Sequence, residues 1–327
     1  MKAIHFDAPG KPEVMKPINV PKPSPSEGQV LIKVKAAGVN RPDLMQREGN
    51  YPAPEGHSKI LGLEVSGEID DIGENVYNYN NGDEVCALVN GGGYAEYCVA
   101  DVGSIIKKPK NLNFIEAAAI PECFFTCWSN LFDRGKIAKN QSVLIHGGSS
   151  GIGTTAIQML KVFDIFSFVT VGSERKKNLC KNLGADVAIN YNKEDFFLKI
   201  KETKKRGVNV ILDMVGGDYV QKNINLLCSD GKLINIAYQM GSKVQIDLIK
   251  VMLKRLIITG STLRIRDSVF KKNIRDSLIK NIVPSIENGK IKPIIDSVFF
   301  FEESFKAHET MYKSEHFGKI VLDMENK

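Results

Sequence analysis

The pattern of apolar and polar positions divides the chain near residue 110. Before that point, short apolar runs with partial alternation are separated by glycines and prolines, which is typical of a twisted β domain with short strands. The pattern predicts strands at 29–36, 60–71, 84–89 and 94–100, and a loop at 38–43. Helices are expected at 114–120 and 124–132, with Pro121 as the interruption between them.

From residue 141 the pattern becomes a regular alternation of strand and helix. Short β-branched runs recur at intervals of roughly 20 to 25 residues, the spacing of right-handed strand–helix–strand units. The expected strands are 143–146, 167–171, 187–191, 208–213, 232–236 and 256–259. Their apolar character on both faces predicts an α/β fold with a doubly wound parallel (Rossmann) sheet.

The last sixty residues leave this alternation. A long amphipathic helix is expected at 268–288, then a strand at 296–300, a helix at 302–313 and a strand at 319–322. The final strand is predicted to rejoin the N-terminal β domain. We therefore expect one domain from residues 1–122 and 268–327, and a Rossmann domain from residues 123–267.

A glycine cluster, Gly147 to Gly153, separates the first strand of the alternating half from the following helix. Glycines in this position let the backbone approach a pyrophosphate, and the first amides of the helix direct N–H groups and a positive dipole end toward it. The glycines do not follow the G-x-G-x-x-G order letter for letter. A structural turn without a ligand is the alternative, and the strand and helix on either side favour a dinucleotide site.

Composition limits the partners. The chain has 327 residues, of which 43% are hydrophobic, and a formal charge of +6 from 44 basic and 38 acidic residues. Its basic residues are scattered, which argues against nucleic acid as a partner and suits a polyanionic cofactor.

The cysteines and the N-terminus indicate the cellular compartment of the protein. The six cysteines show neither a disulfide framework nor zinc-ribbon spacing. No membrane span and no signal sequence is evident. We expect a cytoplasmic protein that has no membrane partner.

The end of the second alternating strand bears on the choice of nicotinamide cofactor. An NAD site usually has a carboxylate there to bind the ribose hydroxyls. Here Gly172 and Ser173 stand at that place, and Lys176 follows, where it can face a 2′-phosphate. NADPH is therefore the expected cofactor, although the neighbouring Glu174 counts against it.

Several motifs together resemble the medium-chain dehydrogenase/reductase superfamily. They are residues 28–34, 38–44, 61–67 and 117–121 and the glycine turn. Its zinc-free quinone oxidoreductases are the most similar group. Residues 43–47 with Gly49 and Tyr51, then 190–191, 194–196 and 318–322, look most like the tumour-suppressor-inducible NADPH:quinone oxidoreductase branch. The resemblance implies that the β-rich domain is a GroES-like catalytic domain.

The resemblance also bears on metal binding. In the zinc alcohol dehydrogenases of this superfamily, a cysteine stands near the position of Asn40 and a histidine precedes the glutamate that matches Glu64. This chain has Asn40 and Leu63 there, and it lacks the four-cysteine lobe. One carboxylate without thiolate or imidazole ligands does not make a zinc site, so we expect a metal-free enzyme.

The resemblance assigns roles to individual residues. Tyr51 and Ser150 are the expected catalytic residues, with Tyr51 donating a hydrogen bond to a quinone oxygen. A packing role for Tyr51 is the alternative. The residues expected to bind the cofactor are Asn40, Thr126, Ser150, Gly151, Ile152, Gly153, Ser173, Lys176, Tyr191, Phe317 and Lys319. His316 replaces an asparagine of the family, and His146 is interpreted as a core histidine.

We expect a homodimer that pairs through the strand at 256–259, and a monomer in which that strand is covered is the alternative. The expected activity is NADPH-dependent reduction of a small-molecule quinone without zinc. Two alternatives stay open. One is reduction of an enoyl thioester or enone within the same superfamily, and the other is a non-catalytic NADPH-binding protein of the crystallin-like or RNA-associated kind.

Overall fold

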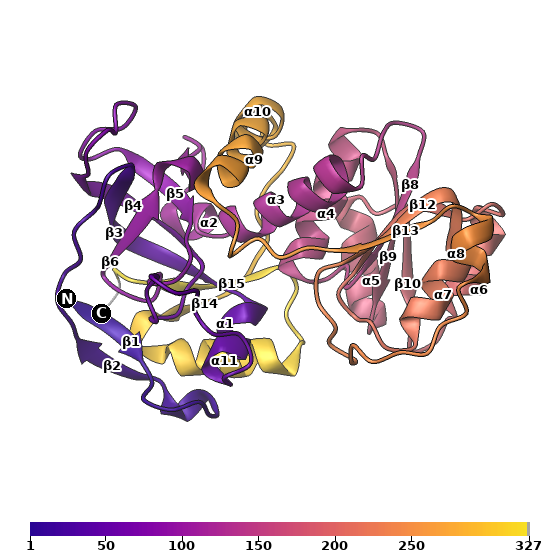
Figure 1. Ribbon diagram of the computed structural model, residues 1–327, viewed down its shortest axis with the longest axis horizontal. Helices are drawn as coiled ribbons and strands as arrows, with labels where there is room; N and C mark the ends of the chain where they lie inside the picture. Colours follow the sequence, from indigo (N-terminus) through magenta and orange to yellow (C-terminus); the bar gives the residue numbers. More distant parts are fainter. Residues whose placement is uncertain (326–327) are drawn as a thin grey trace. The chain divides into compact units, whose positions relative to one another are not determined.

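The computed structural model describes residues 1–325, and the chain divides into two compact units (Figure 1). The first, the β unit, consists of residues 1–125 and 264–327, and the second, the parallel-sheet unit, of residues 126–263. Among the described residues, no helix is long and apolar enough to cross a bilayer.

The β unit is built on one mixed sheet with the strand order β14-β15-β3-β4-β5-β7, and β6 also pairs with β3. The strands are β3 (Gln29–Val39), β4 (Glu64–Ile72), β5 (Glu84–Leu88), β6 (Tyr97–Asp101), β7 (Ile105–Lys107), β14 (Ile295–Phe300) and β15 (Lys319–Asp323). A separate two-stranded ribbon joins β1 (Lys2–His5) to β2 (Lys16–Asn19). The strands expected in this half are confirmed, with ends shifted by a few residues.

The last strand returns to the first long one. β15 runs antiparallel to β3, with Val321 opposite Gly38 and Leu322 opposite Ala37. Ile320 and Leu322 are fully buried in the same apolar cluster as Val30 and Ile32. The predicted return of the C-terminal strand to the N-terminal β domain is confirmed.

Three local predictions were wrong, each at a proline. The expected loop at 38–43 contains the start of α1 (Arg41–Arg47), because Pro42 lies in the first turn, where a missing N–H costs nothing. Pro121 begins α3 (Pro121–Cys127) instead of interrupting a helix. The helix expected at 268–288 is divided into α9 (Ser268–Asn281) and α10 (Val283–Glu287), with Pro284 at the start of the second.

The remaining helices of the β unit are short. They are α2 (Phe114–Ala117), α11 (Ser304–Lys313), and single 3₁₀ turns at Pro12–Val14, Val102–Ser104 and Phe301–Glu303. The chain after α3 continues as a π-helical segment, Trp128–Arg134, in the parallel-sheet unit.

The parallel-sheet unit confirms the predicted Rossmann sheet. Its six strands are all parallel, in the order β10-β9-β8-β11-β12-β13. They are β8 (Ser142–His146), β9 (Phe166–Val171), β10 (Val187–Asn190), β11 (Val208–Asp213), β12 (Leu227–Asn235) and β13 (Ile257–Gly260). The helices are α4 (Gly151–Val162), α5 (Glu174–Leu183), α6 (Phe196–Thr203), α7 (Tyr219–Leu226) and α8 (Ile249–Leu253). The order reverses beside β8, so the glycine turn that follows β8 lies at the switch point where such sheets bind ligands.

A buried chain of hydrogen bonds fixes α1 in the β unit. Arg47 Nη1 donates to His308 Nδ1 at 3.1 Å, and His308 Nε2 lies 3.1 Å from the Tyr94 hydroxyl. Arginine has no acceptor, so Nδ1 must accept and Nε2–H must donate to Tyr94. Burial and the charge of Arg47 lower the pKa of His308 to about 3, which keeps the ring neutral.

The last member of this series of hydrogen bonds is Asp43, which lies 3.5 Å from the Tyr94 hydroxyl. Asp43 Oδ2 accepts from Asn40 N at 2.8 Å and Oδ1 accepts from Gly62 N at 3.1 Å, so it caps α1 and ties it to the segment before β4. Tyr94 and His308 are fully buried. The position of Asn40, at the start of α1, therefore depends on this series of hydrogen bonds.

Tyr94→Phe tests that dependence. The substitution leaves the buried His308 Nε2–H without an acceptor, so we expect the free energy of unfolding to fall by about 1–3 kcal/mol. Urea unfolding at pH 7.5 measures it. Tyr77→Phe is the matched control, because Tyr77 is 84% exposed and its loss should change stability by less than about 0.5 kcal/mol. Equal effects of the two substitutions would contradict the argument.

Candidate functional site

The glycine turn of the parallel-sheet unit is closely packed. A Cβ on Gly153 would lie 2.3 Å from the Gly147 carbonyl oxygen, so a side chain is excluded there. Ser150 is the N-cap of α4: its hydroxyl accepts from Gly153 N at 3.0 Å and donates to Gly147 O at 2.8 Å. The residues that follow the strand are thus held in a tight turn directly against the helix start.

Two amides at this turn are left without acceptors. Gly153 N is bonded to Ser150 and Thr154 N to the Ser150 carbonyl, whereas the amides of Gly151 and Ile152 have no acceptor among residues 1–325. Such N–H groups at the positive end of a helix fit a phosphate. Of the residues expected to bind a pyrophosphate, the structure brings Ser150, Gly151, Ile152 and Gly153 together.

The end of β9 gathers the residues expected at a 2′-phosphate. Ser173 caps α5 by accepting from Lys176 N at 3.3 Å. A Cβ on Gly172 would lie 2.6 Å from the Tyr191 hydroxyl, so the absence of a side chain makes room for that hydroxyl beside Ser173. Tyr191 is 47% exposed. The basic helix start and the tyrosine are therefore neighbours.

The two acidic groups nearest to this place are both engaged. Glu174 Oε1 accepts from Asn190 Nδ2 at 2.7 Å. Glu194 forms an ion pair with Lys177 at 2.5 Å, which lowers the pKa of Glu194. The carboxylate of Glu174, which counted against NADPH in the sequence, is thus directed to an asparagine at the end of β10.

The β unit holds a buried polar cluster formed by Asn40, Glu64 and Lys319. Lys319 Nζ lies 2.6 Å from Glu64 Oε1, 2.6 Å from Asn40 Oδ1 and 2.9 Å from the Val39 carbonyl oxygen. Asn40 Nδ2 donates to the same Glu64 oxygen at 2.9 Å. All three side chains are at most 6% exposed. The three N–H groups of the ammonium are thus all used within the chain.

Burial alone would lower the pKa of Lys319, but the charge of Glu64 and its hydrogen bond outweigh burial and raise it. Glu64 Oε2 accepts from Glu122 N at 2.8 Å. Gly38 is required beside this carboxylate, because a Cβ there would lie 2.1 Å from Glu64 Oε1. The described residues contain no group of three or more His, Cys, Asp or Glu side chains able to hold a metal ion.

A second cluster in the β unit surrounds Tyr51. The Arg264 guanidinium lies 5.4 Å from the centre of the Tyr51 ring, and its nitrogens donate to Gln46 Oε1 at 2.7 Å and to the Asn90 carbonyl at 2.7 Å. Lys271 Nζ donates to Asn90 Oδ1 at 2.7 Å. Burial lowers the pKa values of Arg264 and Lys271. Sequence reasoning missed both cations, because neither belongs to a motif.

The other candidates lie in less distinctive places. Thr126 is partly buried on α3, and its carbonyl accepts from Asn130 Nδ2 at 2.9 Å. Phe317 is half-buried before β15, and its amide donates to Asp296 Oδ1 at 2.8 Å. His146 is fully buried between Thr170 Oγ1 at 3.0 Å and Asn223 Oδ1 at 2.9 Å, so its interpretation as a core histidine is confirmed.

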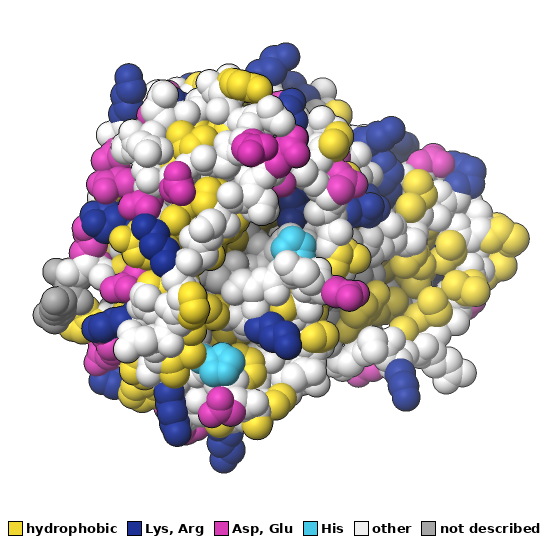
Figure 2. Space-filling model, turned by 60° about the vertical axis from the view of Figure 1, so that its left-hand side comes forward, with side chains coloured by type: hydrophobic (Ala, Val, Ile, Leu, Met, Phe, Trp, Pro, Cys, Tyr) yellow, Lys and Arg dark blue, Asp and Glu magenta, His cyan; other side chains and the backbone are white. Residues whose placement is uncertain are grey.

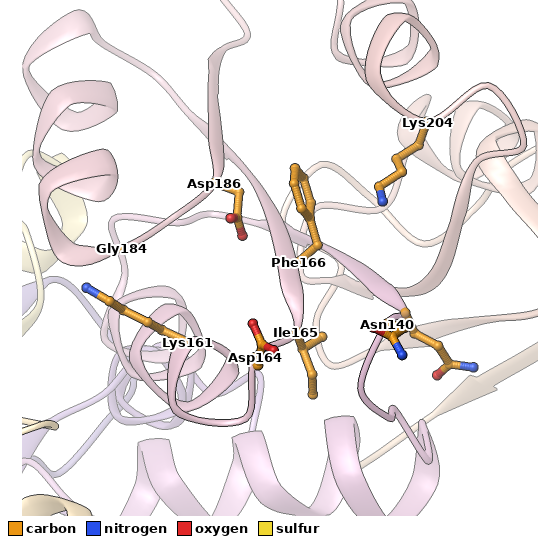
Figure 3. A pocket seen from close by; sticks show the side chains of 9 residues that line it. Asn140, Lys161, Asp164, Ile165, Phe166, Gly184, Asp186 and Lys204 are labelled. Atoms are coloured by element: carbon orange, nitrogen blue, oxygen red, sulfur yellow. The ribbon is translucent and has the colours of Figure 1, made fainter.

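A cavity of about 320 Å³ lies at the amino-terminal ends of the parallel strands, opposite the end that carries the glycine turn (Figure 3). Gln141 and Phe166, which line it, stand at the amino-terminal ends of β8 and β9. Lys204 stands over the Phe166 ring at 4.7 Å, and Asp186 accepts from Ser167 N. The glycine turn lies at the carboxyl ends of the strands, so this cavity is separate from the dinucleotide site.

Comparison with known proteins matches two parts of the chain to families of dehydrogenases. Residues 26–110 match the family described as alcohol dehydrogenase GroES-like domain, and residues 183–322 match the family described as zinc-binding dehydrogenase. The quinone oxidoreductase of Mus musculus is 32% identical over 98% of this chain and 97% of its own length.

Two solved structures are informative. The Escherichia coli quinone oxidoreductase complexed with NADPH superimposes with a TM-score of 0.88 at 25% identity, covering 99% of this chain and 100% of that one. The JamJ enoyl reductase, without ligand, gives a TM-score of 0.87 at 25% identity, covering 99% of each chain.

Lys319→Met tests the buried cluster. The substitution leaves Glu64 as an uncompensated buried charge, so we expect a loss of about 3–5 kcal/mol in the free energy of unfolding at pH 7.5, measured in urea. Adding Glu64→Leu should recover most of that loss. Lys199→Met removes an exposed ion pair and should cost less than about 1 kcal/mol. A double variant as unstable as Lys319→Met would count against the ion pair as the cause.

Proposed function

The chain belongs to the medium-chain dehydrogenase/reductase superfamily of oxidoreductases, and from this premise we propose that it reduces quinones with NADPH and without zinc. The observation that carries the proposal is the position of Lys319. Its ammonium lies on Glu64 and Asn40; by the resemblance, Asn40 stands near the position of a cysteine of the zinc-dependent relatives, and Glu64 directly follows the position of their histidine. Alcohol oxidation needs a Lewis acid to stabilise the alkoxide, whereas a quinone accepts hydride readily once it is oriented.

The glycine turn would hold the pyrophosphate of the cofactor. The free amides of Gly151 and Ile152 supply the donors, and Ser150 keeps the turn in place. The bound nicotinamide supplies hydride. We assign its orientation to Asn40, Thr126, Ser150 and Phe317, by the family resemblance. Lys319 has its three donors engaged, so we assign it the positioning of Asn40.

The preference for NADPH rests on the end of β9. The amide of Lys176 donates to Ser173 Oγ, the Tyr191 hydroxyl lies beside Gly172, and Glu174 is bonded to Asn190. A 2′-phosphate placed there meets a lysine, a tyrosine hydroxyl and the start of α5. An unengaged carboxylate, which would favour the ribose diol of NAD, is absent from the described part of this turn.

Tyr51 is proposed to donate a hydrogen bond to the quinone oxygen as charge develops there. The Arg264 guanidinium lies 5.4 Å from the centre of the Tyr51 ring and donates to the Tyr51 backbone carbonyl at 3.5 Å. Stacking of a cation on the ring favours one orientation of the side chain. The hydroxyl can therefore act as a donor held in place before the substrate binds.

A homodimer is proposed through β13, the edge strand of the parallel sheet. Ile257 and Ile258 are 49% and 41% exposed, and α8 buries none of its residues. Hydrophobic side chains gather over the lobe at the right of Figure 2. An exposed apolar edge strand can pair with the same strand of a second copy of the chain. A single species of 36.2 kDa in sedimentation would exclude the dimer.

With all cysteines free, we place the protein in the cytoplasm.

Reduction of an enone or enoyl thioester is the second candidate, favoured by the similarity to the JamJ enoyl reductase. The two activities share the hydride donor and differ in the acceptor. Fluorescence-detected binding of NADPH with no turnover of any acceptor would select the non-catalytic alternative.

The test of the proposed function is the loss of NADPH absorbance with 1,2-naphthoquinone as acceptor. We expect turnover that is unchanged after exhaustive treatment with EDTA, because no step needs a metal. Enones and enoyl thioesters are compared at equal concentration. Turnover confined to those acceptors, or lost with the metal chelator, would contradict the proposal.

Lys176→Ala tests the cofactor assignment. Removal of a charged contact to the 2′-phosphate should raise the Michaelis constant for NADPH roughly tenfold or more, since bonds to charged groups contribute about 1.5–3 kcal/mol. The constant for NADH should stay the same. Lys181→Ala, an exposed position on the same helix, is the control. Unchanged constants for both cofactors would show that the assignment is wrong.

A further inference from the structure

Two cations of the β unit, Arg264 and Lys271, are buried without a carboxylate partner. Arg264 is 6% exposed and Lys271 is 4% exposed. Arg264 donates to the carbonyl oxygens of Asn90 and Tyr51 and to Gln46 Oε1. Lys271 donates to Asn90 Oδ1 at 2.7 Å and to the Arg264 carbonyl oxygen at 3.2 Å. All of these acceptors are neutral, so neither charge is compensated by a direct contact among residues 1–325.

The other buried cations of the described chain are compensated. Lys319 lies on Glu64 at 2.6 Å, and Arg47 lies on Glu48 at 2.6 Å. A charge removed from water is costly unless a charge of opposite sign and further hydrogen bonds replace the water. Arg264 and Lys271 have the hydrogen bonds without the opposite charge. An anion that comes from outside the chain would supply what is missing.

Each of the two cations also has an N–H group to spare. A guanidinium has five N–H groups and an ammonium has three. Arg264 uses Nε–H, both N–H groups of Nη2 and one of Nη1, and the last of these bonds is long, at 3.5 Å. Lys271 uses two. One N–H group of each cation therefore has no acceptor among residues 1–325, and charged donors of this kind bind carboxylate, sulfonate and phosphate oxygens.

Carboxyl groups farther away compensate these cations only in part. Those that attract Arg264 or Lys271 through their charge are Asp43, Glu122, Asp101 and Asp267. Burial raises the pKa values of Asp43 and Glu122 to about 7, so each is only about half ionised at neutral pH. Asp101 and Asp267 are used to cap a 3₁₀ turn and α9. An excess of positive charge therefore remains around Arg264 and Lys271.

The exposed edge of this cluster is formed by Tyr51 and His57. Tyr51 is partly exposed, and the Arg264 guanidinium lies 5.4 Å from the centre of its ring. The exposed His57 ring has Nε2 at 3.2 Å from Asn90 Nδ2. Burial and the charges of Lys271 and Arg264 lower the pKa of His57. The positive potential thus extends to side chains that a solute can reach.

We propose that Arg264 and Lys271 bind an anionic substituent of the hydride acceptor. The preferred acceptors are then those that carry a carboxylate, sulfonate or phosphate in addition to the group that is reduced. The inference rests on the proposed function and names the class of its substrate. Tyr51 belongs to the same cluster, so an acceptor whose oxygen is bonded to Tyr51 would have its substituent beside the two cations.

The first readout is binding without turnover. Naphthalene-1-sulfonate, which does not accept hydride, is titrated calorimetrically into protein saturated with NADP⁺, so that the cofactor site is filled, and into protein without NADP⁺. Lys271→Gln keeps a donor for Asn90 and removes the charge. We expect it to weaken sulfonate binding roughly tenfold or more, as for the loss of a bond between charged groups, and to affect neutral 1-naphthol much less. Lys280→Gln, at an exposed position of the same helix, is the control.

The second readout compares acceptors that differ in charge. The pairs are 1,2-naphthoquinone-4-sulfonate with 1,2-naphthoquinone, and crotonyl coenzyme A with the crotonyl thioester of N-acetylcysteamine. In each pair, the ratio of kcat/KM for the anionic acceptor to that for the neutral one is measured. Comparing this ratio between variants cancels the difference in intrinsic reactivity. We expect Lys271→Gln to lower the ratio roughly tenfold or more.

Lys271→Arg is the conservative variant. It keeps the positive charge and should retain the preference for anionic acceptors, which provides a second test if the glutamine variant folds poorly. A role of Lys271 limited to fixing Asn90 predicts a different result, because the loss of such a contact would reduce turnover of the charged and the neutral acceptor alike.

The outcomes separate the two proposals. Sulfonate binding that Lys271→Gln leaves unchanged, or a ratio of kcat/KM values that it leaves unchanged, overturns the anion site and leaves quinone reduction standing. A preference for the anionic acceptor that is confined to the thioesters and lost in Lys271→Gln overturns quinone reduction and supports the anion site. If no acceptor is turned over, the proposed function fails, and sulfonate binding alone decides whether the site exists.

Discussion

The ion pair between Lys319 and Glu64 is the constraint on which the β unit depends. It joins the last strand of the chain to a strand near its beginning, and Asn40 completes it from the start of α1. Removing an ammonium and a carboxylate from water costs several kcal/mol for each ion. Here each of the three N–H groups has an oxygen acceptor within 2.9 Å, so the pair is tolerated only in this one arrangement of the three segments.

That arrangement also determines the charge state of its neighbours. Glu64 uses one oxygen for Lys319 and the other for the amide of Glu122. Lys319 has no donor left, so it attracts the Glu122 carboxyl only at a distance while Glu64 repels it. Burial raises the pKa of Glu122 to about 7, and the charge of Glu64 adds to this effect, while Lys319 and Lys271 act in the opposite sense.

The sequence allowed the parallel sheet and the glycine turn to be predicted, because both rest on local patterns: β-branched runs at regular intervals, and glycines between a strand and a helix. Predictions were wrong at Pro42, Pro121 and Pro284. A proline can either interrupt a helix or stand in its first turn, and the local pattern does not distinguish the two. The polar clusters could not be predicted in full. Arg264 and Lys271 lie far along the chain from Tyr51 and Asn90, and only the tertiary fold brings them together.

The ammonium of Lys319 differs from a divalent metal ion in what it can do to a substrate. A metal ion has vacant coordination positions and can polarise a substrate oxygen directly. The three N–H groups of Lys319 are all directed to protein oxygens, so none is available to a ligand. Polarisation must then come from neutral donors that lie outside the pair. We propose Tyr51 as that donor, because the Arg264 guanidinium lies against its ring and burial raises the pKa of its hydroxyl, which therefore stays protonated across the physiological range.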